Sequence, residues 1–167
     1  MSERYSKLFS LPENLYAEGS PVIIAAGALL KDNQTGRVIA QLKLRNISSK
    51  AIKAATVFLS LMNTAGNPLG ESVRYEYLDL SSTRDTDFGS KSAIPLPDAS
   101  TRSFSVAVAE VIFADNSVWN ANDATWEPLK SPEALTSRLD GEMVKQFRIE
   151  YGSRAKNFFL EQKDLWY

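Results

Sequence analysis

The fold is decided by residues 42–61, which read LKLRNISSKAIKAATVFLSL. Apolar and polar residues alternate up to Asn46, as they do in a β-strand with one buried face. A short polar turn at residues 47–50 leads into a second apolar run from Ile52. Two strands joined by a tight turn are typical of an antiparallel sheet. We therefore predict an all-β antiparallel fold.

The chain before this stretch continues the pattern. Residues 22–31 form a long apolar strand in which Gly27 indicates a β-bulge. Residues 32–36 form a turn, and a strand over residues 37–46 follows. In this strand, alternate side chains are predicted to face the core, and the side chains between them are predicted to face water. The second group is Arg37, Gln41, Lys43 and Arg45.

The chain after this stretch carries further strand signals. Val73, Tyr75 and Tyr77 alternate with charged residues, the two prolines of residues 94–97 predict a sheet edge, and residues 103–114 form a second long strand. A hairpin at residues 115–116 follows. Roughly six to eight short strands with frequent turns are the pattern of an immunoglobulin-like β-sandwich.

We divide the chain at Trp126. Residues 1–126 form the sandwich, and residues 127–167 form a short C-terminal helical appendage with an extended tail. Ser131-Pro132-Glu133 has the composition of a helix start, and residues 142–151 have apolar side chains at helical spacing. This segment either packs on the sandwich or leads to a further domain.

Composition excludes several functions. Nineteen basic and twenty acidic residues leave a net charge of −1, which predicts neither nucleic acid nor a membrane surface as partner. The longest apolar run, residues 22–30, is too short to span a bilayer, and we expect a cytoplasmic location unless the full-length protein is membrane-anchored. The chain has no histidine and no cysteine, so a Ser-His-Asp triad, a Cys-His dyad and a His- or Cys-ligated zinc site are impossible. We expect no cofactor and no catalytic residue.

Three groups of residues remain as candidate sites. The loop at residues 84–89, with Asp79, Asp85 and Asp87, offers oxygen atoms to Ca²⁺ or Mg²⁺, although a structural or solvated acidic loop is the simpler reading. Carboxylates for glycoside hydrolysis could come from Glu71, Glu76 and Glu110; Glu110 is predicted on the apolar face of its strand. Aromatic side chains for sugar stacking could be Tyr75, Tyr77, Trp119 and Trp126, which equally suit a hydrophobic core.

Two short patterns match the glycosylation acceptor motif. They begin at Asn33 and at Asn46, and such matches arise often by chance.

Residues 36–57, together with the run Val111-Ile112-Phe113-Ala114-Asp115-Asn116-Ser117-Val118-Trp119, resemble bacterial immunoglobulin-like modules of the FxLYD type. The chain has Asp115-Asn116 where that family has Asp-Gly. The resemblance covers roughly residues 22–119 and implies an interaction or structural role without catalysis. The tail from Tyr151 is similar to the segment that leads into a zinc ribbon in bacterial proteins, but the zinc-binding cysteines are absent here.

The sequence thus favours a non-catalytic protein-interaction or scaffolding module. Its partner is an unknown protein, or a second copy that associates through sheet edges, since unpaired strand edges accept an added strand. A carbohydrate-binding module and a carboxylate-only hydrolase remain as alternatives.

Overall fold

The structure, a computed structural model, describes residues 4–121 and 125–129. These residues form two antiparallel sheets and no helix, which confirms the all-β antiparallel prediction. In the described part of the chain there is therefore no helix that could cross a membrane. The helical appendage predicted within residues 127–167 lies outside the described residues, except for Glu127 to Leu129.

Among the described residues, the larger sheet has seven strands, and β3 and β4 form its centre. Its strands are β1 (Tyr5–Ser10), β2 (Leu15–Tyr16), β3 (Val22–Asp32), β4 (Val38–Asn46), β7 (Asp87–Phe88), β8 (Ile94–Pro95) and β11 (Glu127–Pro128). Strand β8 pairs with the edge of β4 that is turned away from β3, as expected of a strand that contains proline. Strand β11 pairs with β2, so Glu127 and Pro128 belong to this sheet.

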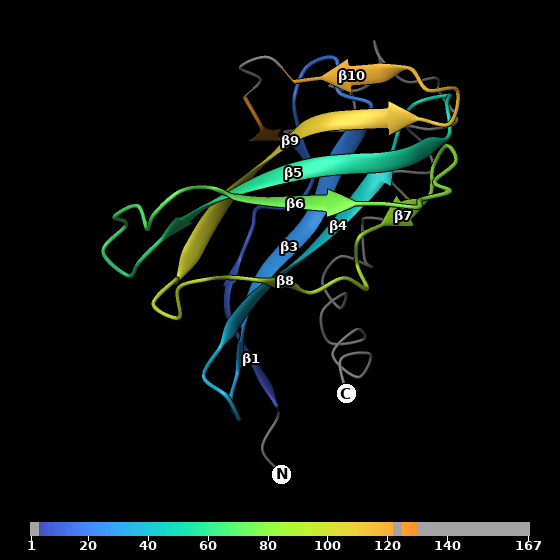
Figure 1. The fold of residues 1–167 in the computed structure, drawn as a ribbon. Coiled ribbons are helices and arrows are strands. Elements are labelled where there is room, and N and C mark those ends of the chain that lie inside the picture. The colour runs from blue at the N-terminus through green and yellow to red at the C-terminus, as the bar shows by residue number, and fades with distance from the viewer. Residues whose placement is uncertain (1–3, 122–124, 130–167) are drawn as a thin grey trace.

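The smaller sheet, within the part of the chain that the structure describes, has four strands in the order β10-β9-β5-β6. They are β5 (Ile52–Met62), β6 (Val73–Tyr77), β9 (Ser103–Phe113) and β10 (Val118–Asn120). In Figure 1 this sheet lies in front, with β10 and β6 as its upper and lower edges, and β3 and β4 pass behind it.

The two sheets share one hydrophobic core. Buried side chains such as Ile24, Leu42 and Leu44 from the larger sheet pack in one cluster with Val57 and Val108 from the smaller sheet. These residues lie at alternate positions along their strands, which is why the alternating pattern predicts them. The connection from β4 to β5 carries the chain from one sheet to the other.

The outer side of β4 differs from the prediction. Gln41, Lys43 and Arg45 are only 1%, 6% and 2% exposed, although the alternation predicts that they face water. The physical reason is that the chain after residue 82 lies against this face, where its carboxylates and carbonyls bind the three side chains. Gln41, for example, donates a hydrogen bond to the carbonyl of Ser90. The alternation therefore predicts the strand β4 correctly, but its prediction that these three side chains face water is wrong.

Gly27 also has a different role from the predicted one. The irregular register in β3 falls between Ile24 and Ala26, so Gly27 is not the bulge. A β-carbon at Gly27 would collide with Cδ1 of Leu11 and come within 2.9 Å of Cδ2 of Leu42. The glycine thus allows the segment before β2 to pack closely against β3.

A bulge in β9 moves Glu110 out of the core. The register against β5 shifts between the pairs Thr56–Glu110 and Val57–Val108. Before the shift the buried residues of β9 have even numbers, and after it they are Val111 and Phe113. Glu110 therefore lies on the outer face of the smaller sheet, since a bulge reverses the alternation.

Replacement of Gly27 by alanine should destabilise the fold by about 1–3 kcal/mol, because the added methyl overpacks the contact with Leu11 and Leu42. Urea unfolding of Gly27→Ala measures this loss. The double variant Gly27→Ala/Leu11→Ala should lose less than the sum of the two single changes, since removal of the Leu11 side chain relieves the collision. Simple additivity would contradict this explanation of the glycine.

Candidate functional site

An open groove lies at the end of the molecule where β4 and β9 finish, on the right in Figure 1. It has a volume of about 860 Å³, and the described residues that line it come from four segments, within residues 16–21, residues 47–50, at Arg84 and within residues 113–119. We call it the end groove. Its principal side chains are those of Tyr16, Ser20, Ile47, Lys50, Phe113 and Trp119. The four segments lie far apart in sequence, and only the folding of the two sheets brings them together.

A buried amide holds one wall of the end groove in place. Asn46 is 0% exposed, and its Nδ2 donates to the carbonyls of Lys50 and Ser82, each at 2.8 Å. Its Oδ1 accepts hydrogen bonds from the backbone N–H and the hydroxyl of Ser48. A buried polar network whose groups are all satisfied restricts the backbone. The turn at residues 47–50 is therefore a preformed wall.

Lys50 joins two walls of the groove. Its Nζ lies 2.9 Å from the Ser117 hydroxyl, 3.2 Å from Oδ2 of Asp115 and 5.3 Å from the centre of the Phe113 ring. Asp115 also accepts hydrogen bonds from the hydroxyl and the backbone N–H of Ser117. These hydrogen bonds, with the nearby ammonium group, lower the pKa of Asp115 to about 2.

Only one of the four predicted aromatic candidates lies in the end groove. Trp119, on the edge strand β10, is half-buried there. Tyr75 and Tyr77 lie on β6 at the opposite edge of the same sheet, with ring centres 5.0 Å apart. Tyr77 is buried, and burial raises the pKa of its hydroxyl above the ordinary value. Trp126 packs against the core just before β11. The four side chains do not form one platform.

The acidic loop binds cations of the protein itself. Oδ1 of Asp85 lies 2.6 Å from Nη1 of Arg45, and Oδ1 of Asp87 lies 2.9 Å from Nε of the same side chain. The other oxygen of Asp87 lies 3.4 Å from Nζ of Lys43. Two acids and two bases thus form a compact cluster on the outer side of β4. Within residues 4–121 and 125–129, no three acidic side chains are placed to hold a metal ion.

The three candidate carboxylates are on the surface. Glu76 and Glu110 lie on the outer face of the smaller sheet, where both pair with Thr56 from opposite sides. Glu76 forms an ion pair with Arg74. Glu71 is exposed in the segment before β6. None of the three lines the end groove.

The two glycosylation motifs have different surroundings. Both hydrogens of the Asn46 amide are donated inside the protein, so this motif is closed to a glycan in the folded chain. The side chain of Asn33 is exposed and donates to the hydroxyl of Ser6 at 2.8 Å.

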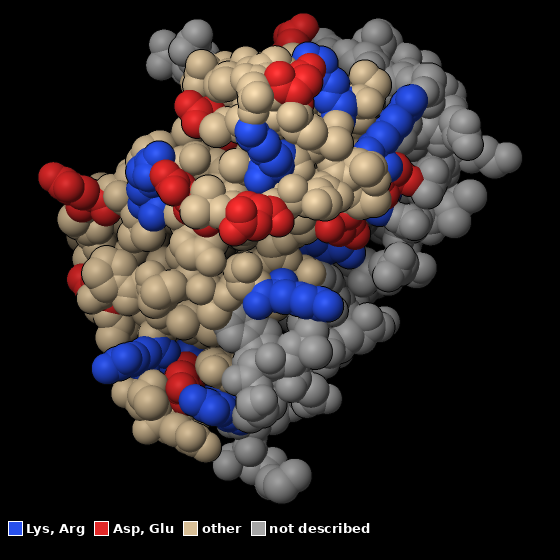
Figure 2. Space-filling model, turned by 45° about the vertical axis from the view of Figure 1, so that its right-hand side comes forward, with Lys and Arg blue, Asp and Glu red and all other residues tan. Residues whose placement is uncertain are grey.

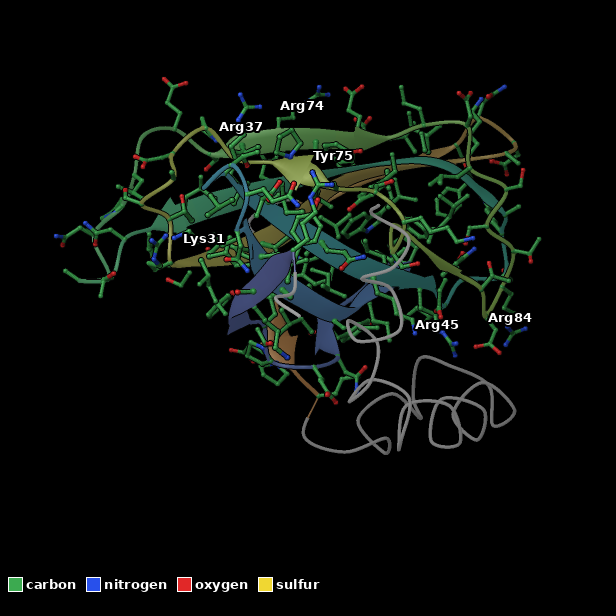
Figure 3. The ribbon with its side chains drawn as sticks, turned by 90° about the horizontal axis from the view of Figure 1, so that it is seen from below. Lys31, Arg37, Arg45, Arg74, Tyr75 and Arg84 are labelled. Atoms are coloured by element: carbon green, nitrogen blue, oxygen red, sulfur yellow. The ribbon has the colours of Figure 1, made fainter. Side chains whose placement is uncertain are left out.

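Charges of both signs are interleaved on the face shown in Figure 2, which turns the right-hand end of Figure 1 forward. Figure 3 shows Arg45 and Arg84 at one end of the molecule and Lys31 and Arg37 at the other. The labelled cations therefore do not gather at one place.

Comparisons of the chain with protein-family models, with curated proteins and with solved structures find no match.

Most residues of the end groove were not candidates on sequence grounds. Tyr16, Lys50 and Val118 carry no motif that marks a site, and they belong to three separate segments. One usable signal is the turn after Asn46, since asparagine followed by two serines is suited to side-chain to backbone hydrogen bonds.

Removal of Arg45 should destabilise the protein strongly. Arg45→Met removes the cation that Asp85 and Asp87 share in a largely buried place, while Asp87 keeps its contact with Lys43, and breaking such a cluster costs about 3–5 kcal/mol. Urea unfolding measures the loss, and Lys91→Met, at an exposed position, is the control with the same loss of one positive charge. Equal stability of the two variants would show that the cluster has little importance.

The low pKa of Asp115 should depend first on the Ser117 hydroxyl. In Ser117→Ala the pKa should rise from about 2 toward its ordinary value of 3.8, but stay below it, because the backbone N–H and Lys50 remain. Titration of the side-chain carboxyl by NMR measures it. A depressed acid stabilises the folded state above its ordinary pKa, and this contribution disappears as pH falls through the folded value.

Asp98 provides the control for this titration. Its pKa is lowered by the hydroxyl and N–H of Ser100 in the same arrangement. Ser100→Ala should raise the pKa of Asp98 and leave that of Asp115 unchanged. A shift of both groups in either variant would contradict the local cause.

Proposed function

We propose that this chain is a non-catalytic protein-interaction module and that the end groove is its binding surface. The observation that carries the proposal is the groove itself, an open space of about 860 Å³ between loops, with one wall held rigid by Asn46. Binding residues are commonly found on loops that a rigid scaffold positions. A preformed wall lowers the entropy that binding costs.

The chemistry of the groove suits a segment of polypeptide. Val118, which is 50% exposed, and the half-buried Trp119 lie over the buried Ile47 and Phe113, beside serine hydroxyls and charges of both signs. Trp and Tyr are enriched where protein interfaces have their strongest contacts. The edge strand β10 forms one border and is only three residues long. The partner is an unidentified protein.

The same proposal includes the class of module. We infer an immunoglobulin-like sandwich that resembles the FxLYD type. Two observations support this: Asn46 organises the turn between two strands, and the hairpin at Asp115-Asn116 precedes Trp119. Asn116 has a φ of 70°, which the glycine of the family pattern would adopt more easily.

Carbohydrate binding is the second candidate, because Tyr16 and Trp119 both line the end groove. Aromatic rings of this kind can stack on sugars.

Site-specific photo-crosslinking tests the function. A benzophenone amino acid replaces Val118, which is 50% exposed in the groove, and in a control chain it replaces Ala65, at the tip of the turn after β5. With extract of the cell that makes the protein, the Val118 position should give a discrete protein adduct that the Ala65 position does not give. Lys50→Ala or Trp119→Ala in the same chain should abolish the adduct, with folding checked by circular dichroism.

The alternatives give different results. Binding to a glycan array that is lost in Trp119→Ala, without a protein adduct, would favour carbohydrate. The same adducts from both positions, or adducts insensitive to Lys50→Ala and Trp119→Ala, would contradict the end groove as the binding surface.

A further inference from the structure

The edge strand β6 presents an open backbone edge. Among the described residues it pairs with β5 alone, so the hydrogen-bonding groups on its other side have no neighbouring strand. It forms the lower border of the front sheet in Figure 1. Such an edge can accept another strand.

The two faces of β6 differ in character. Val73, Tyr75 and Tyr77 pair with core residues of β5 and point toward the shared core; Val73 and Tyr75 are only partly buried. Arg74 and Glu76 lie on the outer face and are exposed. Figure 3 labels Arg74 and Tyr75 on opposite sides of the ribbon. A strand added at this edge would extend the sheet. Its own apolar side chains would continue the face that lies toward the core, and its outer face would lie beside one positive and one negative charge.

The sequence of β6, Val73-Arg74-Tyr75-Glu76-Tyr77, is complementary to itself in charge. In an antiparallel pair of two copies, residues directly opposite point to the same face. With the two-fold axis at Tyr75, Arg74 of one copy lies opposite Glu76 of the other, twice in the dimer. The neighbouring registers that keep both apolar sides on one face are worse, since they place Arg74 opposite Arg74 or Glu76 opposite Glu76.

We propose that β6 is a self-association edge, at which a second copy of this chain adds its own β6 in antiparallel register about Tyr75. The pair joins two four-stranded sheets into one continuous sheet of eight strands. Charged residues on an edge normally discourage pairing. Because Arg74 and Glu76 have opposite charges, pairing with an unrelated strand is unfavourable here and pairing with a second copy of β6 is favourable. The edge is five residues long, so the dimer is weak and depends on concentration.

Charge reversal in the full chain tests the pairing by sedimentation velocity over a concentration series. Arg74→Glu or Glu76→Arg alone places like charges opposite each other and should raise the dissociation constant by about tenfold or more. A mixture of the two single variants should form heterodimers, because each Glu then faces an Arg. The double variant Arg74→Glu/Glu76→Arg should dimerise as the native chain does. Lys91→Glu, at an exposed site and with the same change in net charge as Arg74→Glu, should leave the constant unchanged.

Cysteine substitution tests the register, since the chain contains no cysteine. Tyr75→Cys places two thiols opposite each other at the two-fold axis, and mild oxidation should give a covalent dimer. Val73→Cys is the control, because its two thiols would be about 13 Å apart, four residues along the strand. Efficient cross-linking of both variants, a native chain that stays monomeric, or a mixture of the charge variants that does not associate would each overturn the proposal.

Discussion

One buried amide connects the parts of this molecule on which its proposed function depends. Asn46 ends β4, and its side chain fixes the turn that crosses to the second sheet and the segment at Ser82. Its backbone adds two further hydrogen bonds, from its own N–H to the carbonyl of Thr86 and from the N–H of Asp85 to its carbonyl. Because an unsatisfied polar group in the interior costs about 1–3 kcal/mol, this site favours a single arrangement of the three segments. The end groove takes its shape from that arrangement.

The ion cluster next to Asn46 depends on the same segments. Hydrogen bonds to Asn46 fix Asp85 and Thr86, so the carboxylates on either side of Thr86 reach Arg45. Asp85 has a φ of 68°, in the left-handed region that few residues adopt readily. The energy of that conformation is offset by the two ion pairs of Arg45 and by the neighbouring backbone hydrogen bonds. The carboxylates of this acidic loop, which the sequence offers as possible metal ligands, are thus the counter-ions of the basic side chains on β4.

The sequence predicts what depends on neighbouring residues and misses what depends on distant ones. The alternation in β4 and β6 identifies both strands, because the period of two is a local property. It cannot reveal that Lys43 and Arg45 are buried, since their partner Asp87 comes about forty residues later. The shift that moves Glu110 to the outer face of the smaller sheet arises from pairing with β5 and leaves no mark in β9 alone. Strand β1 is also missed, because its residues are of mixed character and its order comes from pairing with β3.

The end groove and the open edge of β6 lie on opposite borders of one sheet. Strand β10, at one edge of the smaller sheet, borders the end groove. Strand β6 forms the other edge of that sheet, and β9 and β5 lie between the two. Occupation of one surface therefore leaves the other accessible. A pair joined through β6 would have two grooves at its far borders. A partner with two suitable segments would then bind the second groove at a high effective concentration, so that two weak contacts combine into a firm attachment. On this argument a short, weak edge is compatible with a scaffolding role, because the partner itself stabilises the pair when it bridges both grooves.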